Sequence, residues 1–191
     1  MQLVTKDEFY IDNEKYLEKI IGGAVFVYPT DTIYGIGCNA LDSGAVKKIR
    51  ELKDRKDKAF SVIVPSKEWI MENCVVTDVA QEYIENDLPG PITLILELKN
   101  KDAVCKDVLG KETSIGVRIP KHWIRGFVKH LNVPIVTTSV NQTGKKPMTS
   151  VEDIDPEIKA KVSFIIDEGL LPGSPSKIIH LEGKDIKVRE R

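Results

Sequence analysis

The sequence predicts one α/β (α+β) domain that spans residues 1–191. Short apolar runs rich in β-branched residues, typical of buried strands, alternate with stretches whose apolar residues recur at helical spacing. A chain of 191 residues is long enough for one sizeable core, and it contains no internal repeat, low-complexity segment or linker. These observations favour a single layered domain.

The first half of the chain shows this alternation clearly. Apolar residues share one face of a helix predicted over 14–21, which Gly22-Gly23 ends. The run 24–27 predicts a buried strand, and a second apolar stripe predicts a helix over 43–56. The other elements predicted here are a strand at 60–64, helices at 67–73 and 78–86, and a strand at 92–98.

The second half continues the pattern. A strand at 115–119 is stopped by Pro120, and apolar residues at helical spacing predict a helix over 122–131. Pro156 suits the first turn of a short helix. The remaining predicted elements are strands at 135–138, 162–166, 177–181 and 186–189, of which the last two form a hairpin around Glu182-Gly183-Lys184.

Composition and charge exclude several classes of protein. The net charge of −1 gives no overall attraction to nucleic acid or membrane, so an anion site would have to be local. No apolar run approaches the roughly 18–20 residues that span a bilayer, and the acidic N-terminus lacks the apolar core of a signal peptide. Three widely spaced cysteines form neither a disulfide framework nor a zinc motif. We therefore expect a cytoplasmic protein without membrane contact.

The stretch from Tyr28 to Gly37 is a candidate ligand loop. Its hydroxyls, carboxylate and two glycines follow the strand at 24–27, and ligands of open α/β sheets bind at the carboxyl ends of strands. The spacing Gly35-x-Gly37-x-x-Ala40 fits a loose dinucleotide fingerprint. However, the first glycine lies well past the strand, and no acid follows about 20 residues on. An ordinary turn rich in threonine and aspartate is the alternative.

Cations are concentrated in residues 47–58. A solvated helix face with ion pairs explains most such runs and is the alternative here. In this chain the cations continue into a loop that leads directly to the strand at 60–64. Arg55 and Lys58 in that loop are suited to gripping phosphates, the arginine through two hydrogen bonds and the lysine as a point charge.

Two further segments carry polar side chains on or after strands. Thr137, Ser139 and Asn141 lie where the strand at 135–138 ends, and hydroxyls and loop N–H groups bind phosphate oxygens. Arg118 lies inside an apolar strand and has the shape to hold a carboxylate if it faces a cleft. An ordinary turn and a salt-bridged or edge-exposed arginine are the respective alternatives.

The chain offers binders of anions but no motif for a nucleophile. It contains no nucleophile elbow, Walker loop or metal-binding histidine motif, and its three histidines are scattered. We therefore expect no metal site built by the protein. Such a set suits catalysis by positioning and charge stabilisation, as in attack at phosphorus.

Six segments form an ordered set that covers nearly the whole chain. They are P-T-D-T-I-Y-G-I-G-C-N-A at 29–40, L-K-D-R-x-x-K at 52–58, L-P-G-P-I-T-L-I-L at 88–96, S-I-G-V-R-I-P at 114–120, P-I-V-T-T-S-V-N-Q-T-G at 134–144 and I-K-V-R at 186–189. Each segment alone is weak evidence for a family. In this order they resemble the YrdC family, the threonylcarbamoyl-AMP synthases.

The resemblance implies a twisted mixed sheet with flanking helices and a basic concave cleft. It implies an enzyme that condenses L-threonine, bicarbonate and ATP into threonylcarbamoyl-adenylate and releases pyrophosphate, with Mg²⁺ carried by the ATP. It also implies a partner, a tRNA-modifying transferase complex that uses this adenylate.

The resemblance assigns residues to both substrates. For threonine it implies Thr32, Arg118, Thr137 and Ser176. For ATP it implies Lys53, Arg55, Lys58, Ser114, Ser139, Asn141, Thr149 and Arg189, with Lys53 and Arg55 as the catalytic candidates. Asp31 receives no role.

Departures from the family pattern leave alternatives open. The family usually has Lys-Pro-Leu where residues 58–60 are Lys-Ala-Phe, Ser-Ala-Asn where 139–141 are Ser-Val-Asn, and Ser-Thr-Val where 176–178 are Ser-Lys-Ile. One alternative is a paralogue with another carbamoyl-type substrate. The other is an RNA-binding module of the same fold, against which the near-neutral charge and the lack of interleaved basic and aromatic residues weigh.

Overall fold

The computed structural model describes residues 1–55, 57–141, 147–182 and 186–189. Its strands are β1 (Gln2–Thr5), β2 (Phe26–Tyr28), β3 (Gly35–Gly37), β4 (Ser61–Ile63), β5 (Ile92–Glu97), β6 (Ser114–Arg118), β7 (Ile135–Ser139), β8 (Phe164–Asp167), β9 (Lys177–His180) and β10 (Lys187–Arg189). Its helices are α1 (Lys6–Ile11), α2 (Asn13–Ile21), α3 (Ser43–Leu52), α4 (Lys67–Asn73), α5 (Asp78–Asn86), α6 (Lys106–Leu109), α7 (Ile124–Leu131) and α8 (Pro156–Lys161), with one 3-10 turn at Val151–Asp153.

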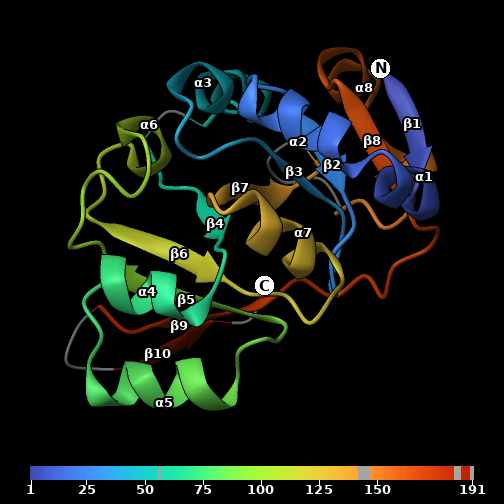
Figure 1. The fold of residues 1–191 in the computed structure, drawn as a ribbon. Coiled ribbons are helices and arrows are strands. Elements are labelled where there is room, and N and C mark those ends of the chain that lie inside the picture. The colour runs from blue at the N-terminus through green and yellow to red at the C-terminus, as the bar shows by residue number, and fades with distance from the viewer. Residues whose placement is uncertain (56, 142–146, 183–185, 190–191) are drawn as a thin grey trace.

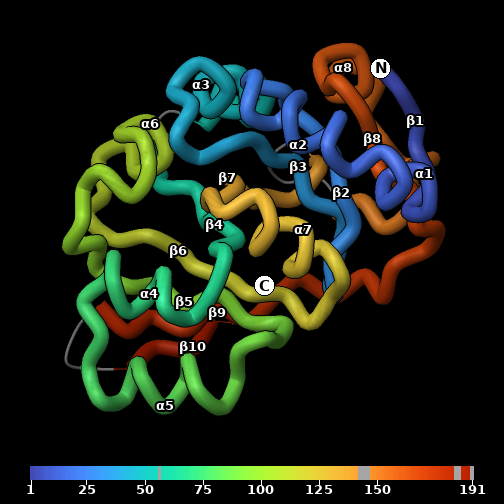
Figure 2. Tube along the Cα trace, viewed as in Figure 1, coloured from blue at the N-terminus to red at the C-terminus, as the bar shows by residue number. Residues whose placement is uncertain are grey.

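The strands form one mixed sheet in the order β1-β8-β2-β3-β7-β4-β6-β5-β9-β10. The sheet contains both parallel pairs, such as β4 with β6, and antiparallel pairs, such as β4 with β7. The sheet is twisted and helices flank it (Figure 1). In the Cα trace, the first strand lies at one edge and the last two strands lie at the other, while β8 returns to lie beside β1 (Figure 2). The predicted α/β fold with a twisted mixed sheet is confirmed.

Most predicted elements occur within one or two residues of their expected bounds, but three local features differ. The helix α3 ends at Leu52 instead of residue 56, because Asp54 takes a left-handed φ of 44° that a helix cannot continue. The elements β1, α1 and α6 were not predicted, and a capping box between Thr5 and Glu8 begins α1. Part of the predicted ligand loop is the strand β3.

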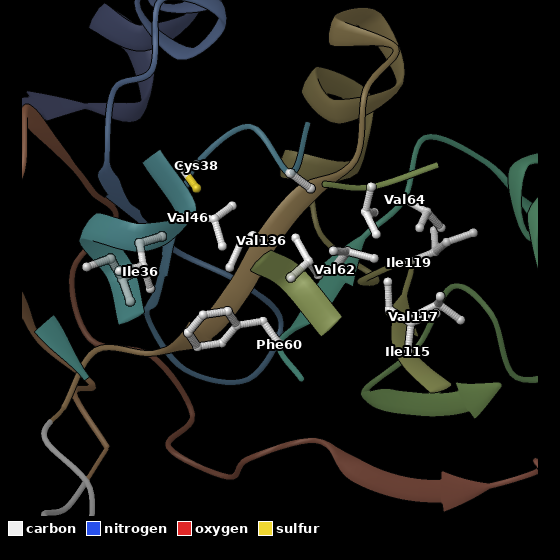
Figure 3. Close-up of a cluster of buried hydrophobic side chains, with 14 of the residues drawn as sticks. Ile36, Cys38, Val46, Phe60, Val62, Val64, Ile115, Val117, Ile119 and Val136 are labelled. Atoms are coloured by element: carbon white, nitrogen blue, oxygen red, sulfur yellow. The ribbon is translucent and has the colours of Figure 1, made fainter. Parts of the chain in front are cut away.

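Two hydrophobic clusters lie on opposite faces of the sheet because side chains alternate along each strand. Val62 and Val136 belong to the larger cluster, shown in Figure 3, which packs against α3, α4, α5, α6 and α8. Ile63 and Ile135 belong to the smaller cluster, which packs against α1, α2 and α7. Among the described residues, β5, β6 and β9 supply side chains to the larger cluster and none to the smaller one.

On the second face of the sheet, the smaller cluster therefore does not cover β6, β5 and β9. We call this region the uncovered face. A row of side chains in register crosses this region, running from Thr137 through Ser61, Gly116 and Ile95 to His180. We call it the cross-strand row. It is small or polar at its first three positions, so space is left above the sheet.

Candidate active site

Two cavities that share a wall lie on the uncovered face. The small cavity has a volume of about 30 Å³ and is lined by Thr30, Thr32, Ile33, Tyr34, Gly35, Ser61, Thr93, Arg118, Thr137, Thr138, Ser139, Pro175 and Ser176. The large cavity, of about 840 Å³, is lined by Arg55, Lys58, Ala59, Phe60, Ser61, Ile95, Glu112, Ser114, Gly116, Ile178, His180, Glu182 and Arg189. The first is polar and narrow, and the second is wide enough for a nucleotide.

The small cavity brings together all four side chains predicted for threonine, Thr32, Arg118, Thr137 and Ser176. They come from four separate segments of the chain. Two threonines that the sequence reasoning missed contact two of these side chains. The hydroxyls of Thr30 and Thr32 lie 2.9 Å apart, and those of Thr93 and Ser176 also lie 2.9 Å apart. Both missed residues lie within the matching family segments, at 29–40 and 88–96.

Arg118 is the charged group of this cavity, and it pairs with Asp31. Its Nη2 donates to Asp31 Oδ1 at 2.9 Å, and the two side chains are 7% and 9% exposed. The backbone N–H of Lys121 donates to the other oxygen of Asp31 at 2.8 Å. Burial lowers the pKa of Arg118 and the Asp31 carboxylate opposes that shift, but an arginine remains charged in either case. Asp31 thus neutralises and orients a buried guanidinium.

The guanidinium of Arg118 also presents a donor toward a ligand. Its Nε is buried and makes no hydrogen bond to any residue that the structure describes. A buried donor without an acceptor costs free energy, and most such groups in native proteins have a partner. A substrate carboxylate in the small cavity would supply that acceptor.

Arg50, on the last turn of α3, shapes the loop that precedes β4. Its guanidinium donates to the carbonyl oxygens of Arg55 at 2.9 Å and Lys58 at 3.2 Å. It also donates to those of Asp107 at 2.6 Å and Val108 at 3.3 Å. Arg50 is therefore an organiser of the loop that carries the predicted phosphate binders. In the sequence, only its place within the run of cations at 47–58 pointed to a role for Arg50.

Two guanidinium groups contact the ring of Phe60. The Cζ of Arg50 lies 4.9 Å from the ring centroid and that of Arg55 lies 5.0 Å from it, within the range of cation–π attraction. Arg55 also donates to the carbonyl of Ala59 at 2.6 Å. The departure to Lys-Ala-Phe at 58–60 thus adds an aromatic surface that positions Arg55.

The predicted ATP residues divide into three groups. Arg55, Lys58, Ser114 and Arg189 line the large cavity, while Ser139 lines the small one. Lys53, Asn141 and Thr149 line neither of these two cavities. The large cavity is also lined by Glu112 and Glu182, so the expected basic cleft is mixed in charge.

Lys53 takes a different position from the one expected of a phosphate binder. It is 6% exposed, and its ammonium donates to the carbonyl of Ser139 at 2.8 Å and to the carbonyl of Asn141. Because Lys53 caps α3, these bonds tie the end of that helix to the end of β7. The geometry supports a positioning role for Lys53, which holds the end of β7 that carries Ser139.

Some of the sequence features lie outside the described residues. They are Lys56, the Q-T-G end of the motif at 134–144, and Gly183-Lys184 of the expected hairpin, whose strands β9 and β10 do pair antiparallel. In the described part of the chain, no group of three His, Cys, Asp or Glu side chains is placed to hold a metal ion. A search of the same residues finds no helix of the length and apolarity that a membrane crossing needs.

Comparisons with known proteins bear on this arrangement. The Sua5/YciO/YrdC family model, described as "Telomere recombination", matches residues 18–191. A protein of Methanocaldococcus jannaschii named putative threonylcarbamoyl-AMP synthase is 40% identical over 183 residues, which are 92% of this chain and 84% of the relative. A threonylcarbamoyl-AMP synthase of Marinobacter nauticus is 30% identical, covering 86% of this chain and 88% of the relative.

Solved structures agree in fold. The P. abyssi Sua5 structure complexed with L-threonine superposes with a TM-score of 0.87 at 29% identity, covering 98% of this chain. This chain spans about half of that protein, 56% of its length. E. coli YciO superposes with a TM-score of 0.82 at 26% identity, covering all of this chain and 94% of that one. The resemblance found in the motifs is confirmed, and the chain belongs to the Sua5/YciO/YrdC family.

Proposed function

We propose that this chain is a threonylcarbamoyl-AMP synthase that condenses L-threonine, bicarbonate and ATP. The observation that carries the proposal is the meeting of Thr32, Arg118, Thr137 and Ser176 in one small cavity. This cavity shares a wall with a larger one that is lined by Arg55, Lys58 and Arg189. The names of the relatives from Methanocaldococcus jannaschii and Marinobacter nauticus support the same activity.

In this proposal Arg118 binds the threonine carboxylate, and the hydroxyls around it bind the rest of the amino acid. The neutral amine of threonine attacks the carbon of bicarbonate, and loss of water leaves a carbamate. A carbamate oxygen then attacks the α-phosphorus of ATP. The bond from that phosphorus to the bridging oxygen breaks, and the electron pair leaves with pyrophosphate. The protein contributes positioning and charge stabilisation, as expected for phosphoryl chemistry.

Arg55, Lys58 and Arg189 hold the phosphates in the large cavity. Mg²⁺ carried with the ATP would supply further charge neutralisation. The product is consumed by a tRNA-modifying transferase complex. The cytoplasmic location and the transferase partner remain predictions.

The test is pyrophosphate release by the purified chain. We expect release when ATP, bicarbonate and threonine are all present, and none when threonine or bicarbonate is omitted. Mass spectrometry of the product should show one carbon from labelled bicarbonate. Release that does not depend on threonine would refute the proposal.

Arg55→Ala tests the phosphate assignment. We expect a loss of activity of about a hundredfold or more, because the guanidinium stabilises charge that develops on the phosphates. Lys47→Ala is the matched control: it removes a cation from the same run, but Lys47 is exposed on α3. Equal activity of the two variants would remove Arg55 from the proposed mechanism.

The paralogue with a different carbamoyl-type substrate is the second candidate, and it rests on the departure from Ser-Thr-Val to Ser-Lys-Ile at 176–178. Lys177, the departure on which it rests, is exposed and does not line the small cavity, whereas Ser176 does. The cavity is therefore unchanged by that departure. Calorimetric binding of threonine, compared with serine and valine, separates the two candidates.

A further inference from the structure

Ser61 lies at the wall between the two cavities. Of the residues that the structure describes, it alone lines both of them. It is the first residue of β4, and its register partners are Thr137 on one side and Gly116 on the other. Thr137 lines the small cavity and Gly116 lines the large one, so Ser61 is the midpoint between them.

The side chain of Ser61 is available to a ligand. The next residue, Val62, points into the larger core, so alternation turns Ser61 to the uncovered face. The residue is half-buried, and its hydroxyl makes no hydrogen bond to another described residue. A polar group in this position normally finds water or a ligand.

The absence of a side chain at Gly116 keeps that hydroxyl accessible. A Cβ at this position would lie 2.4 Å from Ser61 Oγ and 3.1 Å from the methyl of Thr93. Both distances are too short for ordinary contacts, so any larger residue would displace the hydroxyl or close the passage between the cavities. Glycine at position 116 therefore leaves room for a ligand beside the Ser61 hydroxyl.

We propose that Ser61 binds the bicarbonate-derived group, donating a hydrogen bond to an oxygen of bicarbonate and then of the carbamate. This inference rests on the proposed function. The reaction joins the threonine nitrogen to the α-phosphate through one carbon and one oxygen. That carbon must therefore lie between the amino acid in the small cavity and the nucleotide in the large one. Ser61 supplies a neutral donor at that point.

Steady-state pyrophosphate release with bicarbonate varied in buffer purged of carbon dioxide tests this assignment. We expect Ser61→Ala to raise the KM for bicarbonate or lower kcat by about tenfold to a hundredfold, the usual effect of losing one hydrogen bond to an anion. The threonine affinity by calorimetry and the KM for ATP should stay within about twofold, because those groups are held elsewhere. Ser61→Thr, which keeps the hydroxyl, should lie closer to the wild type than Ser61→Ala.

Two serine variants are the controls. Ser114→Ala, on the nucleotide side of the large cavity, should raise the KM for ATP and leave that for bicarbonate unchanged. Ser163→Ala, exposed and just before β8, should leave both unchanged. If Ser61→Ala has the wild-type bicarbonate dependence and kcat, the assignment of Ser61 is wrong while the proposed function stands. If the wild type releases no threonine-dependent pyrophosphate, both proposals are wrong.

Discussion

Replacing Asp31 with alanine would leave the buried guanidinium of Arg118 without its carboxylate. Both side chains are less than one-tenth exposed and their atoms lie 2.9 Å apart, so the pair is a buried ion pair. Breaking such a pair from one side costs about 3–5 kcal/mol. For a chain of 191 residues, each kcal/mol lowers the melting temperature by about 2–4 °C. We therefore expect Asp31→Ala to melt roughly 6–20 °C below the wild type in calorimetry.

A double-mutant cycle tests the cause of that loss. If the uncompensated charge is responsible, Asp31→Ala with Arg118→Met should be more stable than Asp31→Ala alone, because the second change removes the charge. Threonine should also raise the melting temperature of Asp31→Ala more than that of the wild type, since its carboxylate replaces the missing partner. Stability losses that simply add in the double variant, measured by urea unfolding, would refute this reasoning.

Two further predictions concern Arg50 and His122. Arg50→Gln loses most of the bonds that hold the loop before β4, so we expect the KM for ATP to rise by about tenfold with threonine affinity unchanged; Arg50→Lys should not restore it, because lysine lacks the planar fork. An unchanged KM for ATP would show that the loop before β4 keeps its conformation without Arg50. Burial lowers the pKa of His122, although Glu168 at 2.8 Å opposes that shift. As the pH drops through about 6.5, the unfolded chain therefore takes up the His122 proton before the folded chain does, and the free energy of unfolding should fall. His122→Gln should weaken this pH dependence, measured by urea unfolding at several pH values. If the free energy of unfolding of the variant depends on pH as that of the wild type does, other groups cause the dependence.

Much of the fold followed from patterns that involve neighbouring residues. Short apolar runs rich in β-branched residues predicted β5, β6 and β7, because each run is long enough to be recognised without its neighbours in space. The strand β3 could not be predicted in this way. Two of its three residues are glycines, which favour strands weakly, and its pairing with β2 and β7 is a tertiary event.

The site shows the same limit. The cavity positions of Thr32 and Arg118 were expected from the motifs, but no pattern predicted that Asp31 neutralises Arg118 from a segment 87 residues away. Lys53 was expected to hold ATP phosphates, whereas its burial depends on a carbonyl at the end of β7, which no local pattern reveals. Ser61 stood in an apolar strand with no visible function, and its importance follows from the register with Gly116.

The cross-strand row gives the site a fixed length scale. Neighbouring strands lie about 4.8 Å apart, so the four steps from Thr137 on β7 through β4, β6 and β5 to His180 on β9 cover roughly 19 Å. A ligand bound along the row lies across the strands, and its length is measured by their number. The number of strands under the row therefore sets how long a bound ligand can be, in steps of about 4.8 Å. A substitution within one strand changes only the side chain that the ligand meets at that position.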